Sequence, residues 1–320
     1  MSTLVFLEHH GSAIQKGALG VLSKAASLDP DTAGVLIGSG VRELAAQAGQ
    51  YGAKTVYVAD DAGLESPLPQ PRVDVLAALV RDKGFQNVLF GASVLASDIA
   101  GGLSARLDAG LNWDMNDLEV RDGALVGKRS ALGDTVRADV GWSAEPRLGL
   151  IRAGSFEATA GGGDAAVEDV PVALEGFSTK AELVEHTQEE STGPSIEDAD
   201  ILVTGGRGLG GPEGFGPLEE LAAALGGAVA STRAVVDSGW YPYPTQIGQT
   251  GKVVSPKVYI GFGVSGAIQH KVGMQTSQVI IAINKDGNAP IFEFSDLGVV
   301  GDLNTVVPQL TALVKERRGG

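Results

Sequence analysis

Polar and glycine residues near the C-terminus follow an apolar segment in a pattern that could hold an anionic cofactor. The segment VYIGFG, at 258–263, is apolar, has the length of a strand and ends in glycines, which is typical of a parallel strand that leads into a phosphate-binding turn. Ser265, Gly266 and Ala267 then open a short predicted helix. Because free N–H groups at such a start favour an anion such as a pyrophosphate, we expect a nucleotide cofactor here.

Further polar residues come at the ends of neighbouring segments. The apolar segment VIIAIN ends in Asn284, PIFEF reads as the next strand, and Asp302 precedes the last predicted helix. Ligands of open α/β sheets bind outside the carboxyl ends of the strands. We therefore expect the segment from Ser265 to His270 to converge with Asn284 and Asp302.

A second glycine-rich loop follows the apolar segment ILVTGG at 201–206. Its sequence from Gly206 to Gly211, GRGLGG, has the GxGxxG spacing after a predicted strand, which alone is a weak indication of dinucleotide binding. The usual acidic residue about 20 positions further on is missing, since the first acid after the predicted helix is Asp237. This spacing disfavours an ordinary NAD-binding domain, and Arg207 inside the loop predicts pairing with a phosphate or another charged group.

The composition excludes several kinds of site. The chain of 320 residues has no cysteine and four scattered histidines, so disulfides, iron–sulfur clusters and thiol chemistry are excluded and a zinc site is disfavoured. The net charge of −15 argues against nucleic acid as a partner. No apolar stretch reaches the roughly 18 residues of a membrane span, and the N-terminus lacks the basic region of a signal peptide, which predicts a cytoplasmic location.

The first half of the chain predicts an α/β domain. Apolar segments of strand length at 4–9, 34–39, 55–60 and 87–93 alternate with helical patterns, which indicates a doubly wound parallel sheet. The pattern becomes β-rich from about residue 111 to about residue 175, with a hairpin turn predicted at Asp122–Gly123.

A polar segment separates this region from the second half. Residues 187–200 contain Gly193–Pro194 and lack periodicity, which indicates a linker. Residues 1–194 carry a net charge of −12 and residues 195–320 only −3. We therefore predict an N-terminal domain over 1–193 and a C-terminal domain over 194–320. Two helices of the second domain are predicted from apolar residues at helical spacing, namely Leu218, Leu221, Ala222 and Leu225 in one and Leu303, Val306, Val307, Leu310 and Val314 in the other.

Six sequence blocks in the second half carry a resemblance to a known family. They are VTGGRGL, STRAVVDSGW, QIGQTGKVVSPKVYI, GVSGAIQHKVGM, VIIAINKD and GVVGDL, in this order between about residues 200 and 305. In order and spacing they resemble the FAD domain of the α subunit of electron transfer flavoprotein, and the first half is similar in organisation. The resemblance implies a Rossmann-like C-terminal FAD-binding domain after a doubly wound N-terminal domain, in a heterodimer with a β subunit.

Carried over position by position, the resemblance implies a set of FAD contacts in the second domain. They are Arg207, Thr232, Arg233, Ile247, Gly248, Gln249, Thr250, Ser265, Gly266, Ala267, Ile268, Gln269, His270, Asn284, Asp302 and Leu303.

Three of these residues are expected near the flavin ring. Flavin reduction places negative charge along N1–C2–O2, where His270 would supply a donor or a cation. Arg233 would stabilise the same charge by at most about 4 kcal/mol at 4 Å and an effective dielectric near 20, which corresponds to somewhat over 0.1 V for one electron. Thr250 is suited to a hydrogen bond with flavin N5. Structural alternatives are a buried core histidine, an exposed surface arginine and an ordinary turn threonine.

Further predicted contacts are the hydroxyl of Thr232, next to Arg233, and the residues that would hold the adenosine half of FAD. Thr232 stands where the family usually has serine, so a hydroxyl is kept while the added methyl restricts its rotamer. Asn284, Asp302 and the backbone of Leu303 would hold the ADP half. Asp302 is equally placed to cap the last helix.

The resemblance implies a redox carrier. FAD would accept single electrons from flavin dehydrogenases, such as the acyl-CoA dehydrogenases of fatty acid β-oxidation, and pass them to a membrane quinone oxidoreductase. The sequence shows no acid–base pair or nucleophile placed to transform a substrate, which fits a carrier better than an enzyme. Three alternatives stay open: an NAD-dependent oxidoreductase that uses GGRGLGG, an adenine-nucleotide sensor built on the N-terminal layer, and a flavoprotein that bifurcates electrons from NADH with a second flavin in the β subunit.

Overall fold

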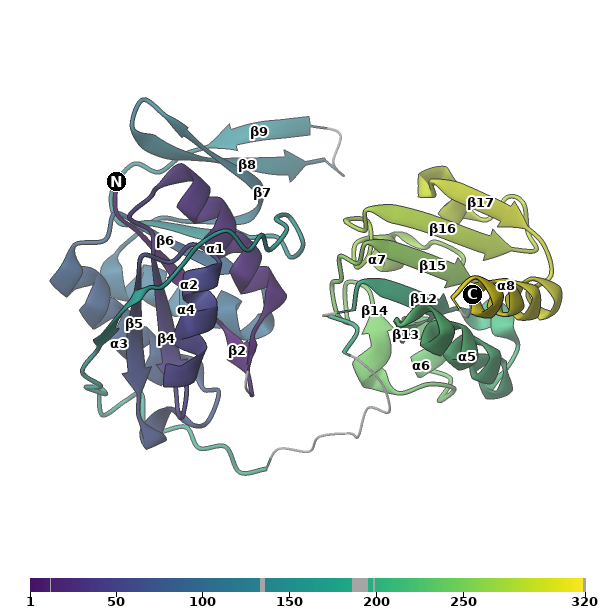
Figure 1. Ribbon diagram of the computed structural model, residues 1–320, viewed down its shortest axis with the longest axis horizontal. Coiled ribbons are helices and arrows are strands. Elements are labelled where there is room, and N and C mark those ends of the chain that lie inside the picture. The colour runs from purple at the N-terminus through teal and green to yellow at the C-terminus, as the bar shows by residue number, and fades with distance from the viewer. Residues whose placement is uncertain (12, 133–135, 186–194, 198, 319–320) are drawn as a thin grey trace. The chain divides into compact units, whose positions relative to one another are not determined.

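The computed structural model describes residues 1–11, 13–132, 136–185, 195–197 and 199–318. The chain divides into two compact units, Met1–His186 and Thr187–Gly320 (Figure 1). Each unit has its own large sheet. The predicted boundary near residue 193 and most of the predicted linker over 187–200 lie outside the described residues.

The first unit is built on a nine-stranded sheet with the strand order β11-β5-β4-β1-β6-β10-β7-β8-β9. The strands from β11 to β7 are parallel, and β7, β8 and β9 form an antiparallel extension. The strands are β1 (Thr3–Phe6), β4 (Ala33–Gly38), β5 (Thr55–Asp60), β6 (Asn87–Gly91), β7 (Leu111–Arg121), β8 (Ala124–Ala131), β9 (Val136–Val140), β10 (Arg147–Ile151) and β11 (Ala166–Asp169). The helices are α1 (Lys16–Leu28), α2 (Ala45–Gln50), α3 (Pro69–Lys83) and α4 (Val94–Leu107), and a small ribbon pairs β2 (His9–His10) with β3 (Ala13–Ile14).

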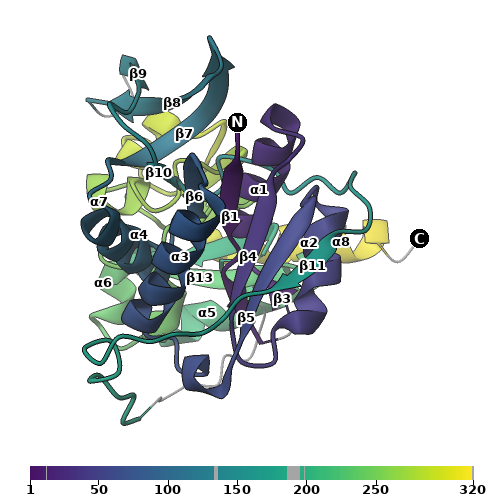
Figure 2. The same ribbon diagram turned by 90° about the vertical axis from the view of Figure 1, so that its left-hand side faces the viewer.

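Helices cover both faces of this sheet. Leu4 and Phe6 of β1 belong to the core under α3 and α4, whereas Val5 and Leu7 belong to the core under α1 and α2. Figure 2 shows the two helix pairs on opposite sides of the strands. Because successive side chains of a strand point to opposite faces, a strand covered on both faces is apolar throughout. The doubly wound α/β fold predicted from these apolar segments is confirmed.

The antiparallel extension begins at the hairpin predicted at Asp122–Gly123. Both residues have positive φ angles, 53° and 77°, as a two-residue type I′ turn requires. Arg121 and Ala124 pair across the turn, so the predicted hairpin is confirmed.

The second unit contains a six-stranded parallel sheet with the order β14-β13-β12-β15-β16-β17. Its strands are β12 (Ile201–Gly205), β13 (Ala228–Thr232), β14 (Gln246–Ile247), β15 (Val258–Phe262), β16 (Val279–Asn284) and β17 (Leu297–Val300), and its helices are α5 (Phe215–Leu225), α6 (Arg233–Val236), α7 (Ile268–Lys271) and α8 (Leu303–Arg318). In chain order this is the 3-2-1-4-5-6 arrangement of dinucleotide-binding folds, whose ligands bind where the order reverses. The reversal here lies between β12 and β15.

Apolar faces of α5 and α8 cover one side of this sheet. The residues predicted to share a face in each helix pack into one core with Val203, Ile260 and Phe262 of the strands. One predicted strand is wrong: PIFEF, at 290–294, forms a short 3₁₀ turn, and the next strand is β17. Pro290 favours a helical start, and Ile291 is buried in the core of the opposite face without joining the sheet.

Candidate functional site

Two glycine loops meet at the point where the strand order of the second sheet reverses. The N–H of Gly206, after β12, donates to the carbonyl of Phe262 at 2.9 Å, and the N–H of Gly208 donates to that of Gly263, after β15, at 3.0 Å. A Cβ at Gly206 would lie 2.3 Å from the carbonyl oxygen of Gly263. The loops therefore require glycine and leave a backbone-lined surface at the carboxyl edge of the sheet.

Groups that bind anions remain free at this edge. Arg207 is exposed in the turn after β12, and no described residue forms a hydrogen bond or ion pair with its guanidinium. The N–H groups of Ser265, Gly266 and Ala267 likewise have no acceptor among the described residues. Because α7 is a single turn of four residues, it contributes little as a helix dipole. A phosphate at this edge would therefore be bound by these backbone N–H groups and by Arg207.

The end of β13 presents a hydroxyl and a second guanidinium. Thr232 precedes α6 and makes no side-chain capping hydrogen bond. Arg233 lies next to it, and its Nε is 3.3 Å from a carboxylate oxygen of Asp237, with the two side chains 64% and 62% exposed. Asp237 offsets part of the positive charge of Arg233. The stabilisation of reduced flavin by about 4 kcal/mol, given above as the upper limit for an unpaired Arg233, is therefore too large for this residue.

The loop after β14 packs against the loop after β15. The N–H of Gln249 donates to the carbonyl of Gln269 at 2.8 Å. Gly248 has a φ of 142°, and a Cβ there would lie 2.9 Å from the same carbonyl oxygen. Ile247 is buried, whereas Thr250 and Ile268 are exposed. The two predicted cofactor segments, 247–250 and 265–270, are thus held together by backbone contacts.

His270 joins the same two loops through its side chain. It is 6% exposed, its Nδ1 lies 3.2 Å from the carbonyl oxygen of Ile247, and its Nε2 lies 2.8 Å from the hydroxyl of the fully buried Tyr259. A carbonyl only accepts, so Nδ1 carries the proton and Nε2 accepts from Tyr259.

Burial lowers the pKa of His270 to about 4 and raises that of Tyr259 above its ordinary value, so both side chains are neutral at pH 7. In this structure the ring therefore has neither a charge nor a free N–H, which disfavours a cation at this residue; its contact with FAD stays a prediction. In this structure His270 is a satisfied buried histidine that connects Tyr259 with the loop after β14.

The last three predicted contacts lie at the end of β16 and after β17. The side chain of Asn284 donates to the carbonyl of Val264 at 2.9 Å and accepts from the N–H of Asp286 at 3.0 Å. Asp302 accepts from the N–H of Asn304 at 2.9 Å, which is the capping role that the sequence left open. Leu303 begins α8 and packs against the core under that helix.

All the predicted contact residues thus lie at or just after the carboxyl ends of parallel strands in one sheet. Two supporting residues were not identified from the sequence. Tyr259 was read only as part of an apolar strand, although a buried tyrosine hydroxyl normally needs a partner. Gln246 lies just before the predicted contacts and is 3% exposed.

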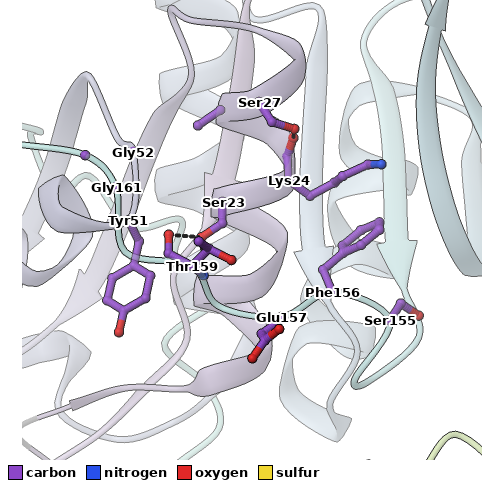
Figure 3. Close-up of a pocket in the computed structure, with 12 residues that line it drawn as sticks. Ser23, Lys24, Ser27, Tyr51, Gly52, Ser155, Phe156, Glu157, Thr159 and Gly161 are labelled. Carbon is purple, nitrogen blue, oxygen red and sulfur yellow. Dashed lines mark hydrogen bonds between the residues drawn. The ribbon is translucent and has the colours of Figure 1, made fainter. Parts of the chain in front are cut away.

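The first unit has a surface pocket of about 650 Å³ between α1 and residues 155–162 (Figure 3). No predicted contact residue lines it. Ser23 exchanges hydrogen bonds with the backbone of Thr159 at 3.2 Å, and Lys24 pairs with Asp117 at 2.8 Å while lying over the ring of Phe156. These polar groups hold the segment against the helix, which makes them poor candidates for a ligand.

The carboxyl edge of the first sheet carries a buried acid. Glu8 follows β1, is 5% exposed, and accepts hydrogen bonds from Ser93 at 2.5 Å and Gln15 at 3.3 Å. The carboxylate of Glu8 thus lies at the N-terminus of α4, where an anionic ligand would otherwise be stabilised. This arrangement disfavours a nucleotide phosphate beside β1.

The described residues offer neither a metal site nor a membrane-spanning helix. They contain no group of three or more histidine, aspartate or glutamate residues that could hold a metal ion. Among their helices, none combines the length and the apolar character needed to cross a bilayer.

Comparisons with known proteins agree with this geometry. The family described as "Electron transfer flavoprotein FAD-binding domain" matches residues 195–275, and the "Electron transfer flavoprotein domain" matches residues 3–175. The chain is 41% identical to "Electron transfer flavoprotein subunit alpha" of Mycobacterium leprae over 323 residues, which covers 99% of both chains. It is 41% identical to the protein of that name in Mycobacterium tuberculosis (strain ATCC 25618 / H37Rv), again over 99% of both. "Protein FixB" of Clostridium saccharobutylicum is 38% identical and covers 98% of this chain and 96% of its own.

Proposed function

Because the chain belongs to the family of electron transfer flavoprotein α subunits, we propose that it carries single electrons on FAD as one subunit of a heterodimer. The second unit contains the family's FAD-binding domain. The observation that carries the proposal is the carboxyl edge of its 3-2-1-4-5-6 sheet, where the glycine loops, the free N–H groups and Arg207 come together. This set of groups fits a dinucleotide with a pyrophosphate.

The sixteen contacts named from the sequence are proposed as the FAD site. Arg207 and the N–H groups of Ser265 to Ala267 would hold the pyrophosphate. Asn284, Asp302 and the backbone of Leu303 would hold the adenosine half. Thr232, Arg233 and Thr250 would face the ring. Bound FAD would supply the one-electron chemistry, whereas the residues of this chain would bind the cofactor, orient it and adjust its potential.

We propose a carrier without a substrate of its own. Both nitrogens of His270 are engaged and its pKa is lowered to about 4, so it is unsuited to serve as a general base. The relatives' name "subunit alpha" supports a β subunit as the partner. Flavin dehydrogenases such as acyl-CoA dehydrogenases as donors, and a membrane quinone oxidoreductase as the acceptor, are proposed from the family resemblance.

The alternatives gain no support from the geometry. Rossmann domains that bind NAD carry an acid at the end of the second strand, whereas β13 ends in Thr232 and is followed by Arg233. An adenine-nucleotide sensor on the first sheet is disfavoured by the buried carboxylate of Glu8. Bifurcation with NADH would depend on the β subunit.

The test is the visible spectrum of the chain purified with its β subunit, followed by stepwise anaerobic reduction. We expect one FAD per heterodimer and a one-electron-reduced form that accumulates before full reduction. A colourless complex that binds NAD or AMP would overturn the proposal. Arg233→Ala tests one residue of the site, because a variant that accumulates as much one-electron-reduced flavin as the parent would refute its electrostatic role.

A further inference from the structure

The loop that contains Thr250 is closed by its own backbone. The N–H of Lys252 donates to the carbonyl of Gln246 at 2.8 Å, and the N–H of Gly248 donates to that of Lys252 at 3.1 Å. A Cβ at Gly251 would lie 2.4 Å from the carbonyl oxygen of Gln246. The two ends of the loop are therefore fixed against each other, and Thr250 lies at its tip.

The buried side chain of Gln246 reaches across this loop to Thr250. Its Nε2 lies 3.0 Å from the carbonyl oxygen of Thr250 and 3.2 Å from the hydroxyl oxygen of the same residue. A carbonyl can only accept, so the nitrogen of the amide must face it. The amide nitrogen has two hydrogens, one for each oxygen, and the hydroxyl of Thr250 accepts the second.

The carbonyl of Thr250 has a further donor. The hydroxyl of Tyr243 lies 3.2 Å from it, and this side chain is 62% exposed. Tyr243 thus fixes the backbone of the loop tip from the solvent side, whereas Gln246 alone contacts the hydroxyl among the described residues.

We propose that Gln246 is a positioning residue that orients the Thr250 hydroxyl as a hydrogen-bond donor to the cofactor. Because the hydroxyl accepts from Gln246, its single hydrogen is left to point away from the loop. This inference rests on the proposed function, in which Thr250 faces the flavin ring. A donor held in that direction stabilises the negative charge that the ring gains with the first electron.

The test is Gln246→Glu in the FAD-loaded complex with the β subunit. Glutamate has nearly the same shape but its carboxylate only accepts, so it draws the Thr250 hydrogen towards itself. We expect shifted flavin absorption bands and a first-electron equilibrium about tenfold less favourable for reduction, which is about 59 mV lower in potential.

A double-mutant cycle separates orientation of the hydroxyl from the added charge. In a Thr250→Val background there is no hydroxyl to turn, so most of the shift caused by Gln246→Glu should disappear. Gln309→Glu is the charge control, because Gln309 is exposed on α8, and it should leave both spectrum and potential as in the parent. A shift of the same size in both backgrounds would overturn the proposal.

Three other results bear on the inference. If Gln246→Glu does not fold, Gln246→Met keeps the length without the amide. It should lower the potential by less than the roughly 59 mV expected for Glu, and a Met variant identical to the parent would overturn the proposal. A parent complex without FAD would overturn the proposed function together with this inference. A parent complex that binds FAD, with a Gln246→Glu complex of unchanged spectrum and potential, would overturn this inference alone.

Discussion

At the scale of single residues, burial decides what His270 can do. The ring is 6% exposed, and both of its nitrogens have partners inside the protein. Burial lowers its pKa from 6.5 to about 4, below the value it would have in an unfolded chain. The unfolded chain therefore binds more protons than the folded one between these two pH values.

This difference predicts how the stability of the second unit depends on pH. The free energy of unfolding should fall as the pH drops from about 6.5 to about 4, by at most about 3 kcal/mol from this residue. Hydrogen exchange of backbone amides in the second unit, at several pH values, measures this free energy of unfolding. His270→Gln should lose this part of the pH dependence, and the comparison cancels the contribution of carboxylates. Equal pH slopes for parent and variant would contradict the assigned neutral state.

Asp237 gives a second prediction at this scale. Its carboxylate lies 3.3 Å from Arg233, so Asp237→Asn leaves the guanidinium without its counter-charge. If Arg233 faces the flavin as proposed, the first-electron potential should rise. The added stabilisation of the one-electron-reduced flavin should be at most about 1 kcal/mol, because solvent screens the two exposed groups. Potentiometry at low and high salt measures it, and the rise should shrink at high salt. An unchanged potential at low salt would place Arg233 away from the ring.

Residue roles could be predicted from the sequence only in part. Asp302 was correctly placed as a possible cap because a cap depends on neighbours in the chain, here Asn304. The charge state of His270 depends on burial, which lowers its pKa, and the position of its proton depends on Tyr259 and Ile247, which are 11 and 23 positions away. The fold brings them together, and no local spacing indicates such contacts.

At the scale of elements, the glycine loops after β12 and β15 are the most sensitive part of the site. A Cβ at Gly206 would meet the backbone of Gly263, which cannot move aside as a side chain can. We expect Gly206→Ala to destabilise the second unit by about 1–3 kcal/mol and to weaken FAD binding. Chemical denaturation and cofactor retention measure the two effects.

A matched control is available in the same unit. Gly216 lies in α5, and a Cβ there would meet nothing within 4 Å, so Gly216→Ala should stabilise the unit by roughly 0.5–1 kcal/mol. If both alanine variants behave alike, the backbone contact between the two loops does not exist as described.

Strands covered on both faces were predictable because their apolar segments are continuous, as in β1 and β16. The strand order of the second sheet was not predictable from periodicity, because β14 has only two residues, Gln246–Ile247, and two residues show no periodic pattern. The segment at 290–294 was misread because Ile291 is buried in a turn, and burial in a turn leaves the same apolar residues as burial in a short strand.

At the scale of the whole molecule, each core belongs to one unit. Within the part of the chain that the structure describes, the two core clusters of the first unit contain no residue of the second, and the two cores of the second unit contain none of the first. A ligand that binds one folded unit stabilises that unit by mass action. FAD and substitutions in the core of the first unit should therefore act on separate unfolding transitions.

Calorimetry of the chain with and without FAD tests this separation. FAD at 100 times its dissociation constant should stabilise the second unit by about 2.7 kcal/mol and leave the first transition in place. Leu4→Ala, at a fully buried position of the first unit, identifies the other transition and should lower it by about 2–5 kcal/mol. Because Leu4 belongs to a core cluster of the first unit, FAD should shift the second transition equally in parent and variant. A single transition that moves with both FAD and Leu4→Ala would show instead that the two units unfold together.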